Sequence, residues 1–475
     1  MTLKKIFIFL AFASPLVAQQ KEYGKVHEPT SLVYPPSRHA PIHKATALHL
    51  YTFMALIGRT DIRPDEPSGI AVTRLKSTDD PKSKTDDDDL TVYGLNTGQN
   101  NILFNSSMQS LDVYEGKGRK QKLNKPRGIA ANANGDVYIA DTGNNRIVRL
   151  HNPGNYLTFA DAYGKQGKKP GEFDEPRGVA LDQSGRVFVS DANNDRIQIF
   201  DAHMQFQYAI GDRSDTADVS KLLYRPDAIA LIDATEEAGY YRESFLIVVD
   251  LNNTRLRKYT LDGQFIAGMN STDYGYQQVY LTSVAIDFYS NVWVTDMFNH
   301  CVHKFNKDLQ YITSFGHIGD GDHEFFEPRA IGIWKKLGQV FIVDKKSAQY
   351  YHIGTDIYNM EVSQQDSSIR FDFFLTETSK VSASILDQTG RPIAKLISNQ
   401  TVQQGANSLL WDRVDRPINS NIFLNRFKKD STQTSDSTKA QKIFPSGLYK
   451  LKLEARTTYI YSRYFTKTVE LEFAF

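Results

Sequence analysis

The sequence has a single cysteine, Cys301, among 475 residues, so no disulfide can form within the chain. It also lacks a net charge of any size, because 56 Lys and Arg residues face 55 Asp and Glu residues. A balanced chain has no overall field that would hold nucleic acid or an anionic membrane, so we expect no nucleic-acid partner. Short catalytic signatures are absent as well: no Gly-X-Ser-X-Gly elbow, phosphate-binding loop or His-Glu-X-X-His pair occurs.

Long apolar runs are scarce, and the one of note lies at the start. Residues Ile6–Val17 are mostly apolar, follow two lysines and lead to the small residue Ala18. This pattern predicts a secretory signal peptide over residues 1–18. About 12 apolar residues are too few to cross a bilayer core, which needs about 20. We therefore expect a secreted, periplasmic or cell-surface protein with no transmembrane segment after cleavage.

A repeated segment dominates residues 45–360. The clearest copies are KPRGIAANANGDVYIADTGNNRIVRL, from Lys125, and EPRGVALDQSGRVFVSDANNDRIQIF, from Glu175. The weaker copies begin at Arg225, Leu281, Glu327 and, in eroded form, Glu66. Each copy has three short alternating runs separated by Gly, Asn or Asp turns, and a fourth run follows. Six such copies predict a six-bladed β-propeller.

The N-terminal residues before the repeats have two expected roles. Residues 19–44 contain Pro35, Pro36 and Pro41 without apolar periodicity, which predicts an extended tether. Ala47–Gly58 resembles the fourth strands yet precedes the first copy, whereas the last copy lacks one. We expect this segment to complete the sixth blade, because closure pairs edges that an open stack would expose.

The last region, residues 366–475, has a different pattern. Short alternating strands, among them IRFDFFL, KVSASIL and SGLYKLKLEA, are separated by turn residues. They predict an immunoglobulin-like β-sandwich, so the fold class is all-β: a six-bladed propeller followed by a sandwich. Residues 419–442 are rich in Ser, Thr and charge, which predicts a flexible surface insert.

Two resemblances agree with this division. The motifs PRGIA…DVYIADTGNNRI and PRGVA…RVFVSDANNDRI resemble NHL repeats, a family that implies a six-bladed propeller. The segments LDQTGRPIAKL, GANSLLWDRVD and FPSGLYKLKLEA resemble the FlgD-type immunoglobulin-like domain of many exported bacterial proteins. The insert at 419–442 departs from that second family, which usually has a short turn there.

Two repeat positions carry charge. One is an acid that ends a strand beside an Asn or Gly turn, and we expect it to accept backbone N–H bonds and hold the turn. Its members are Asp141, Asp191, Asp250, Asp296 and Asp344. The other lies at the start of the inner strand, where side chains would converge on one face and bind an anionic ligand or a carboxylate-bearing partner. Its members are Arg127, Arg177, Asp227, Ser283 and Arg329. The alternative for these arginines is a salt bridge between blades that belongs to the repeat itself.

Metal binding is a further alternative. The NHL fold also carries the peptidyl-α-hydroxyglycine amidating lyase, which this chain resembles in architecture and which holds zinc with three histidines. TDMFNHCVHKF resembles one histidine region of that lyase, with His300 at the matching position, but Arg127 and Arg177 stand where that family has a zinc ligand. Strand alternation also places His300 and His303 on opposite faces. We expect no cofactor, with calcium at Asp86–Asp89 or a zinc ion as the open alternatives.

A complete fold pattern without a catalytic one predicts an exported binding or scaffold protein and not an enzyme. Its propeller face would bind a protein, peptide or glycan of the bacterial cell envelope. The alternative is a metal-dependent lyase or hydrolase, amidating-lyase-like or lactonase-like, whose ligands come from several blades and leave no linear motif.

Overall fold

The computed structural model describes residues 31–34, 43–79, 90–106, 110–211, 222–414, 443–459 and 465–475. The expected signal peptide, the acidic run at 86–89 and the insert at 419–442 lie outside the described residues. Within those ranges the chain is all-β apart from short 3-10 turns and one α-helix, α2 (Ala47–Leu56). None of the described helices is long and apolar enough to cross a membrane.

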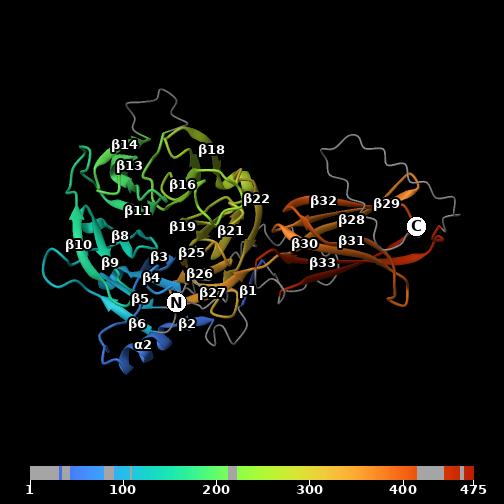
Figure 1. Cartoon of the computed structure of the whole chain (residues 1–475), viewed down its shortest axis with the longest axis horizontal. Helices are drawn as coiled ribbons and strands as arrows, with labels where there is room; N and C mark the ends of the chain where they lie inside the picture. Colours follow the sequence, from blue (N-terminus) through green and yellow to red (C-terminus); the bar gives the residue numbers. More distant parts are fainter. Residues whose placement is uncertain are drawn as a thin grey trace, which may run out of the picture.

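Six sheets form a β-propeller, in the left half of Figure 1, and each sheet is one blade. In blades 1 to 5 the strands follow chain order from the channel outward. The strands of blades 1 to 3 are β3 (Pro67–Arg74), β4 (Leu90–Asn96), β5 (Asn101–Ser106) and β6 (Ser110–Tyr114); β7 (Ile129–Ala131), β8 (Asp136–Asp141), β9 (Arg146–His151) and β10 (Thr158–Tyr163); and β11 (Pro176–Leu181), β12 (Val187–Asp191), β13 (Arg196–Phe200) and β14 (Phe206–Ile210). Those of blades 4 and 5 are β15 (Ile229–Ile232), β16 (Phe245–Asp250), β17 (Arg255–Tyr259) and β18 (Phe265–Asn270); and β19 (Leu281–Ile286), β20 (Val292–Asp296), β21 (Cys301–Phe305) and β22 (Tyr311–Phe315).

Blade 6 is assembled from both ends of the propeller sequence. It contains β25 (Pro328–Trp334), β26 (Gln339–Asp344) and β27 (Ser347–Ile353), with β1 (Leu32–Val33) and β2 (Lys44–Thr46) both paired to β27. A short parallel pair, β23 (His317–Ile318) and β24 (Glu324–Phe325), lies in the connection from blade 5. The six inner strands are neighbours in a closed ring, and β25 contacts β3. The predicted six-bladed propeller is therefore confirmed.

The middle strands of the blades are buried on both faces. All five residues of β12 and all five of β20 are buried, because each blade packs between two others. This explains why their sequences, VFVSD and VWVTD, are continuously apolar before the final Ser-Asp or Thr-Asp pair. The outer strands β10 and β18 instead contain only half-buried and exposed residues, which alternate regularly in β18.

The N-terminal segment closes the ring, but with other residues than expected. Leu32 pairs with Ile353, and Lys44 pairs with Gln349, so parts of the expected tether at 19–44 form the outer strand of blade 6. The side chain of Leu32 is fully buried in the core that blades 5 and 6 share. Docking of this strand covers the outer edge of β27.

The expectation of a strand at Ala47–Gly58 was wrong, because Ala47–Leu56 forms α2. Thr46 caps the helix: its hydroxyl accepts the His49 N–H, and the His49 ring accepts the Thr46 N–H. The segment ALHLYTFMAL is apolar all round, and such a run does not distinguish a helix from a strand by periodicity. Only the cap and the Ala and Leu content favoured the helix.

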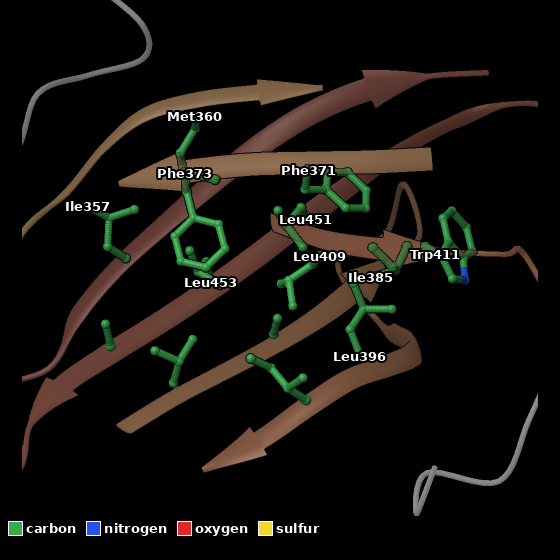
Figure 2. Packing of buried hydrophobic residues seen from close by; sticks show 14 of the residues in the cluster. Ile357, Met360, Phe371, Phe373, Ile385, Leu396, Leu409, Trp411, Leu451 and Leu453 are labelled. Carbon is green, nitrogen blue, oxygen red and sulfur yellow. The ribbon is translucent and has the colours of Figure 1, made fainter. Parts of the chain in front are cut away.

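The C-terminal region is a two-sheet sandwich, on the right in Figure 1. One sheet contains β28 (Ile357–Gln365), β29 (Ser368–Leu375) and β32 (Gly405–Trp411); the other contains β31 (Pro392–Val402), β30 (Ser379–Leu386), β33 (Leu448–Thr457) and β34 (Lys467–Ala474). The sandwich begins at Ile357, earlier than the expected 366, because β28 pairs with β29. Figure 2 shows its core, in which Phe371 and Trp411 pack against Leu451 and Ile385 from the other sheet. The predicted β-sandwich is confirmed.

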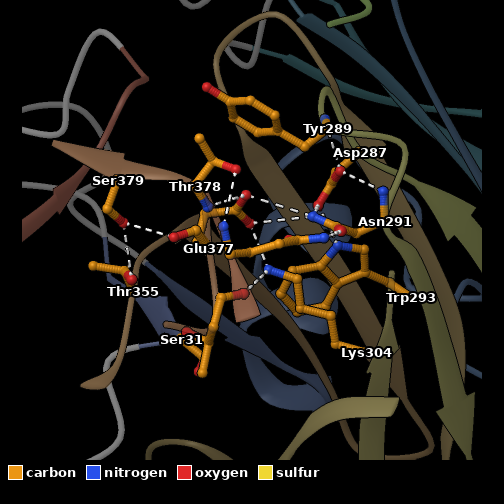
Figure 3. Close-up of polar contacts among 12 residues, drawn as sticks. Ser31, Asp287, Tyr289, Asn291, Trp293, Lys304, Thr355, Glu377, Thr378 and Ser379 are labelled. Atoms are coloured by element: carbon orange, nitrogen blue, oxygen red, sulfur yellow. Dashed lines mark hydrogen bonds and ion pairs between the residues drawn. The ribbon is translucent and has the colours of Figure 1, made fainter. Parts of the chain in front are cut away.

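A buried polar network joins the two domains (Figure 3). The Lys304 Nζ of β21 lies 2.5 Å from Glu377 Oε2, which follows β29, and donates to the Thr376 carbonyl at 2.8 Å. Asn291 donates to Asp287 at 2.9 Å and to Glu377 at 3.5 Å. Because a buried charge is costly without partners, this network ties the sandwich to blade 5.

Candidate functional site: the mouth of the propeller channel

The inner strands of all six blades begin at one end of the channel, around a cavity of about 220 Å³. In the clearest repeats each blade contributes a Pro-Arg-Gly triplet just before or at the start of its inner strand. The cavity is therefore the point where one repeat position from every blade meets. Differences between blades at this position decide its chemistry.

Glycine follows arginine in these triplets because adjacent blades approach each other closely. A Cβ on Gly128 would lie 2.2 Å from the Arg177 carbonyl oxygen, and one on Gly178 would lie 2.4 Å from that of Asp227. Cβ atoms do not approach backbone oxygens so closely, and only glycine fits. The motif thus serves the packing of the ring as well as the chemistry of the cavity.

The structure brings all the candidate ligand-face residues to this one cavity. They are Arg127, Arg177, Asp227, Ser283 and Arg329. Together they place three guanidinium groups and one carboxylate around its mouth.

Strand register corrects the sequence alignment in blade 5. Leu281 pairs with Asp296, as the triplet proline of blade 3 pairs with Asp191. Thr282 and not Ser283 therefore holds the position of the arginines, although both line the cavity. The weak repeat there gave no Pro-Arg-Gly landmark, so an error of one residue was not visible before the pairing was known.

Two blades have a hydroxyl where the others have a charge. Thr282 Oγ1 donates to the Pro328 carbonyl at 2.9 Å, and Ser68 Oγ donates to the Pro126 carbonyl at 3.1 Å. Each hydroxyl thus bonds to the next blade and leaves the cavity free of charge on that side. Sequence reasoning did not single out Ser68, because the first repeat is eroded.

Arg177 lies in an ion-pair network. Its side chain is 11% exposed and donates to Asp227 at 3.0 Å and to Glu175 at 3.1 Å. Burial alone would lower the pKa of this guanidinium, but Asp227 and then Glu175 outweigh it and hold the pKa above its usual value. The alternative that arginines at this position bridge blades therefore describes Arg177, since Asp227 belongs to blade 4.

The other two arginines differ. Arg329 pairs with Glu327, its own neighbour, at 2.8 Å, and Glu327 keeps a lowered pKa because Arg329 and Lys345 outweigh its burial. Arg127 is exposed, and its side chain makes no hydrogen bond or ion pair with the described residues. The Nε–H groups of Arg177 and Arg329 are buried and have no hydrogen-bond partner in the described part of the chain. The guanidinium of Arg127 thus remains available at the cavity.

The recurring acids lie elsewhere, at the ends of the second strands, and all are buried. In blade 2, Asp141 accepts the Asn124 N–H at 2.6 Å, and in blade 3, Asp191 accepts the Asp174 N–H at 2.7 Å. The corresponding donors to Asp250, Asp296 and Asp344 are the N–H groups of Tyr224, Tyr280 and Phe326. These donors belong to the loop that arrives from the preceding blade. The acids therefore fasten the connections between blades, and Asp296 and Asp344 also accept N–H groups of their own turns.

His300, the zinc candidate from the lyase resemblance, also holds a connection between two blades. It adopts φ +56° at the end of a turn, and its Nδ1 accepts the Glu327 N–H at 3.0 Å. Asn145 makes the same contact to Glu175 of the next blade at 2.8 Å. His300 thus replaces an asparagine of the repeat, and its Nδ1 lone pair is already engaged.

The cavity offers few donors for a metal. Among the described lining residues Asp227 is the one carboxylate, and none is His or Cys. Asp227 already accepts from Arg177 and from Asn253. The resemblance to a three-histidine zinc site does not extend to these lining residues.

A second cavity, of about 540 Å³, lies between α2 and blades 1 and 6. Its lining is mostly apolar and includes Leu50 and Phe53 of α2, Leu103 and Phe341. The helix also exposes large apolar side chains to solvent, such as Leu56, which is 78% exposed. The sequence did not indicate this cavity because it depends on the helix that was expected as a strand.

Comparisons with known proteins concern the repeat and the fold. Residues 123–150 and 173–200 match the NHL repeat, and they are blades 2 and 3 without their outer strands. No curated protein matches the chain. Similar solved structures include a streptogramin B lyase, 15% identical with a TM-score of 0.39 over 60% of this chain and 94% of that one.

Two further structures have the same level of similarity. Virginiamycin B lyase from Staphylococcus aureus is 14% identical with a TM-score of 0.39, over 58% of this chain and 82% of that one. PorZ, a surface component of the type-IX secretion system of Porphyromonas gingivalis, is 11% identical with a TM-score of 0.37, over 81% of this chain and 58% of that one. Similarities of this size say nothing about activity.

Proposed function

We propose that this chain is an exported binding or scaffold protein whose channel mouth holds an anionic group of a cell-envelope partner. The partner is a protein, peptide or glycan that presents a carboxylate. The observation that supports this is the set of hydrogen-bond donors left over in one cavity, where three arginines face a single lining carboxylate.

The donors are arranged in a way that suits a carboxylate. Arg127 has a whole guanidinium available, which is a planar fork that binds a carboxylate through two parallel hydrogen bonds. Arg177 and Arg329 each retain an Nε–H without a partner among the described residues. Both terminal nitrogens of Arg177 and one of Arg329 are anchored by acids, so these side chains are held in place before a ligand arrives, which lowers the entropic cost of binding.

The sandwich has a separate part in this proposal. We infer that it is a FlgD-type immunoglobulin-like module that connects the propeller to the cell envelope. The junction at Lys304 and Glu377 would then keep the channel mouth at a set orientation to the attachment point. Limited proteolysis tests this: the junction predicts that the two domains resist separation in the wild-type chain.

The binding test uses the immobilised full chain and solubilised cell envelope. Wild-type protein should retain a partner, and Arg127→Ala should bind that partner about 10-fold or more weakly. A hydrogen bond to a charged group usually contributes about this much affinity. Arg127→Lys should restore less than half of the binding, because an ammonium lacks the fork. Arg391→Ala, an exposed arginine of the sandwich with an ion pair to Asp387, is the matched control.

Defined probes separate the partner classes. A tripeptide with a free C-terminal carboxylate is compared with its amide, and an oligogalacturonate is compared with its methyl ester, each by calorimetry. Equal recovery of partners by wild-type and Arg127→Ala protein would refute the proposal. Turnover of a substrate, together with a stoichiometric metal that is lost on mutation of Asp227, would favour the lyase or hydrolase alternative instead.

A further inference from the structure

Blade 5 differs from other blades at the corner where its buried acid pairs with the next strand. In blades 2, 3 and 4 the residue opposite the acid is an arginine, whose Nε donates to the carboxylate. The pairs are Asp141–Arg146 at 2.7 Å, Asp191–Arg196 at 2.9 Å and Asp250–Arg255 at 2.7 Å. In blade 5 the residue opposite Asp296 is Cys301. The arginine that neutralises the acid in those blades is therefore missing.

The corner of blade 5 contains three potential metal ligands instead. Cys301 and His303 lie two residues apart on β21 and face the same side, toward Asp296. His303 Nε2 lies 3.1 Å from Asp296 Oδ2 and 3.8 Å from Cys301 Sγ, and the ligand atoms are all within 4.8 Å of one another. The exposed fractions are 0% for Asp296, 3% for Cys301 and 0% for His303.

We propose that Asp296, Cys301 and His303 bind a divalent transition-metal cation, with zinc the best fit, as a structural site within blade 5. Tetrahedral zinc with bonds of about 2.0–2.3 Å holds its ligand atoms about 3.3–3.8 Å apart. The distances from His303 Nε2 to Asp296 and to Cys301, 3.1 and 3.8 Å, are close to this range. A mixed sulfur, nitrogen and oxygen set suits zinc, whereas calcium and magnesium take oxygen ligands.

Charge supports the same assignment. The cation carries two positive charges, and the carboxylate of Asp296 with the thiolate of Cys301 carries two negative ones, so the closed site is neutral, as burial requires. Binding replaces the S–H bond of Cys301 by a sulfur–metal bond and releases one proton to solvent.

The surroundings would hold the ligands in position. His303 Nδ1 lies 2.7 Å from Ser314 Oγ, which leaves Nε2 directed at the other two ligands. Ser314 is also bonded by Tyr276 and Tyr311. The Tyr274 hydroxyl is buried without a hydrogen-bond partner among the described residues, and its ring lies 5.2 Å from that of His303. A site so closed to water fits a structural role.

The competing explanation is that His303 alone replaces the missing arginine as the partner of Asp296. The two explanations differ in metal content. The full chain is produced with zinc in the medium, dialysed and measured by elemental analysis. We expect about one zinc per chain in the wild type, and less than about 0.1 in Cys301→Ser/His303→Gln. Replacement by Co²⁺ should give a thiolate-to-cobalt charge-transfer band that Cys301→Ser abolishes.

The chain offers a matched control from its own repeat. Cys301→Arg/His303→Gln installs the residues that blade 3 has at these positions, Arg196 and Gln198, so it should fold without metal and keep its unfolding temperature in a chelator. The His203→Gln variant changes an exposed histidine of blade 3, and the variant protein should keep the zinc of blade 5. Wild-type protein that takes up no zinc on refolding, shows no cobalt–thiolate band and unfolds at the same temperature with and without a chelator would overturn the proposal.

Discussion

Replacing Lys304 by methionine tests the buried junction between propeller and sandwich. The change keeps an apolar stem of similar length over Trp293, whose ring lies 4.6 Å from the Lys304 Nζ, and removes the charge. Glu377 is then left without its cation, at 0% exposure. Removing one partner of a buried ion pair costs about 3–5 kcal/mol, and we expect that loss in the free energy of unfolding at pH 8.

The loss should depend on pH, because Glu377 titrates near neutrality. Burial raises the pKa of Glu377 to about 7, against the opposing effect of Lys304 and with a further increase from Asp287. A carboxyl whose folded pKa lies above the unfolded value of about 4.5 contributes stability that is present below pH 4.5 and lost as pH rises through 7. In the wild type, the stability that Glu377 contributes below pH 4.5 exceeds its contribution above pH 7 by about 3 kcal/mol. Lys304→Met removes the cation and so raises the pKa of Glu377 in the folded state further. The unfolding free energy that the variant loses relative to wild type should therefore shrink toward pH 5.

Urea unfolding of the full chain at pH 5 and pH 8 measures both effects. Lys307→Met is the control: it breaks a partly exposed pair with Glu243 at 2.8 Å and should cost about 0–1 kcal/mol at either pH. Glu377→Gln removes the titrating group, and its stability should no longer fall between pH 4.5 and 7. A deficit for Lys304→Met that matches Lys307→Met, or that is equal at both pH values, would refute the reasoning.

Three further changes test the closure and packing of the ring, each by urea unfolding. Leu32→Ala empties a fully buried site in the closing strand and should cost about 2–5 kcal/mol, whereas Leu48→Ala, 70% exposed on α2, should change stability by less than about 0.5 kcal/mol. Gly178→Ala places a Cβ 2.4 Å from a neighbouring carbonyl and should cost about 1–3 kcal/mol, while Gly239→Ala, whose nearest contact is 3.7 Å, should be near neutral. Asp191→Ala leaves the buried Arg196 without its acid and should cost about 3–5 kcal/mol; a loss below about 1 kcal/mol would contradict the fastening role.

Much of the propeller was readable from the sequence because its elements are local. Each blade is a series of hairpins between adjacent segments, so the repeat spacing and the turn residues predicted strands, blade count and the second domain. The same locality brought Arg127, Arg177, Asp227 and Arg329 to one cavity, since equivalent residues of a closed ring meet at its axis.

Contacts between residues far apart in the chain were decided only by the tertiary structure. The sequence determined that an N-terminal strand was needed for closure, but pairing of Leu32 with Ile353 chose which residues supply it. Strand register assigned Thr282 to the arginine position. The Lys304–Glu377 junction depends on the approach of two domains, and the corner at Asp296 depends on burial within blade 5; periodicity encodes neither. Local hydrogen bonding therefore determined the strands of each blade, and tertiary packing determined which side chains meet at the closing strand, the cavity and the domain junction.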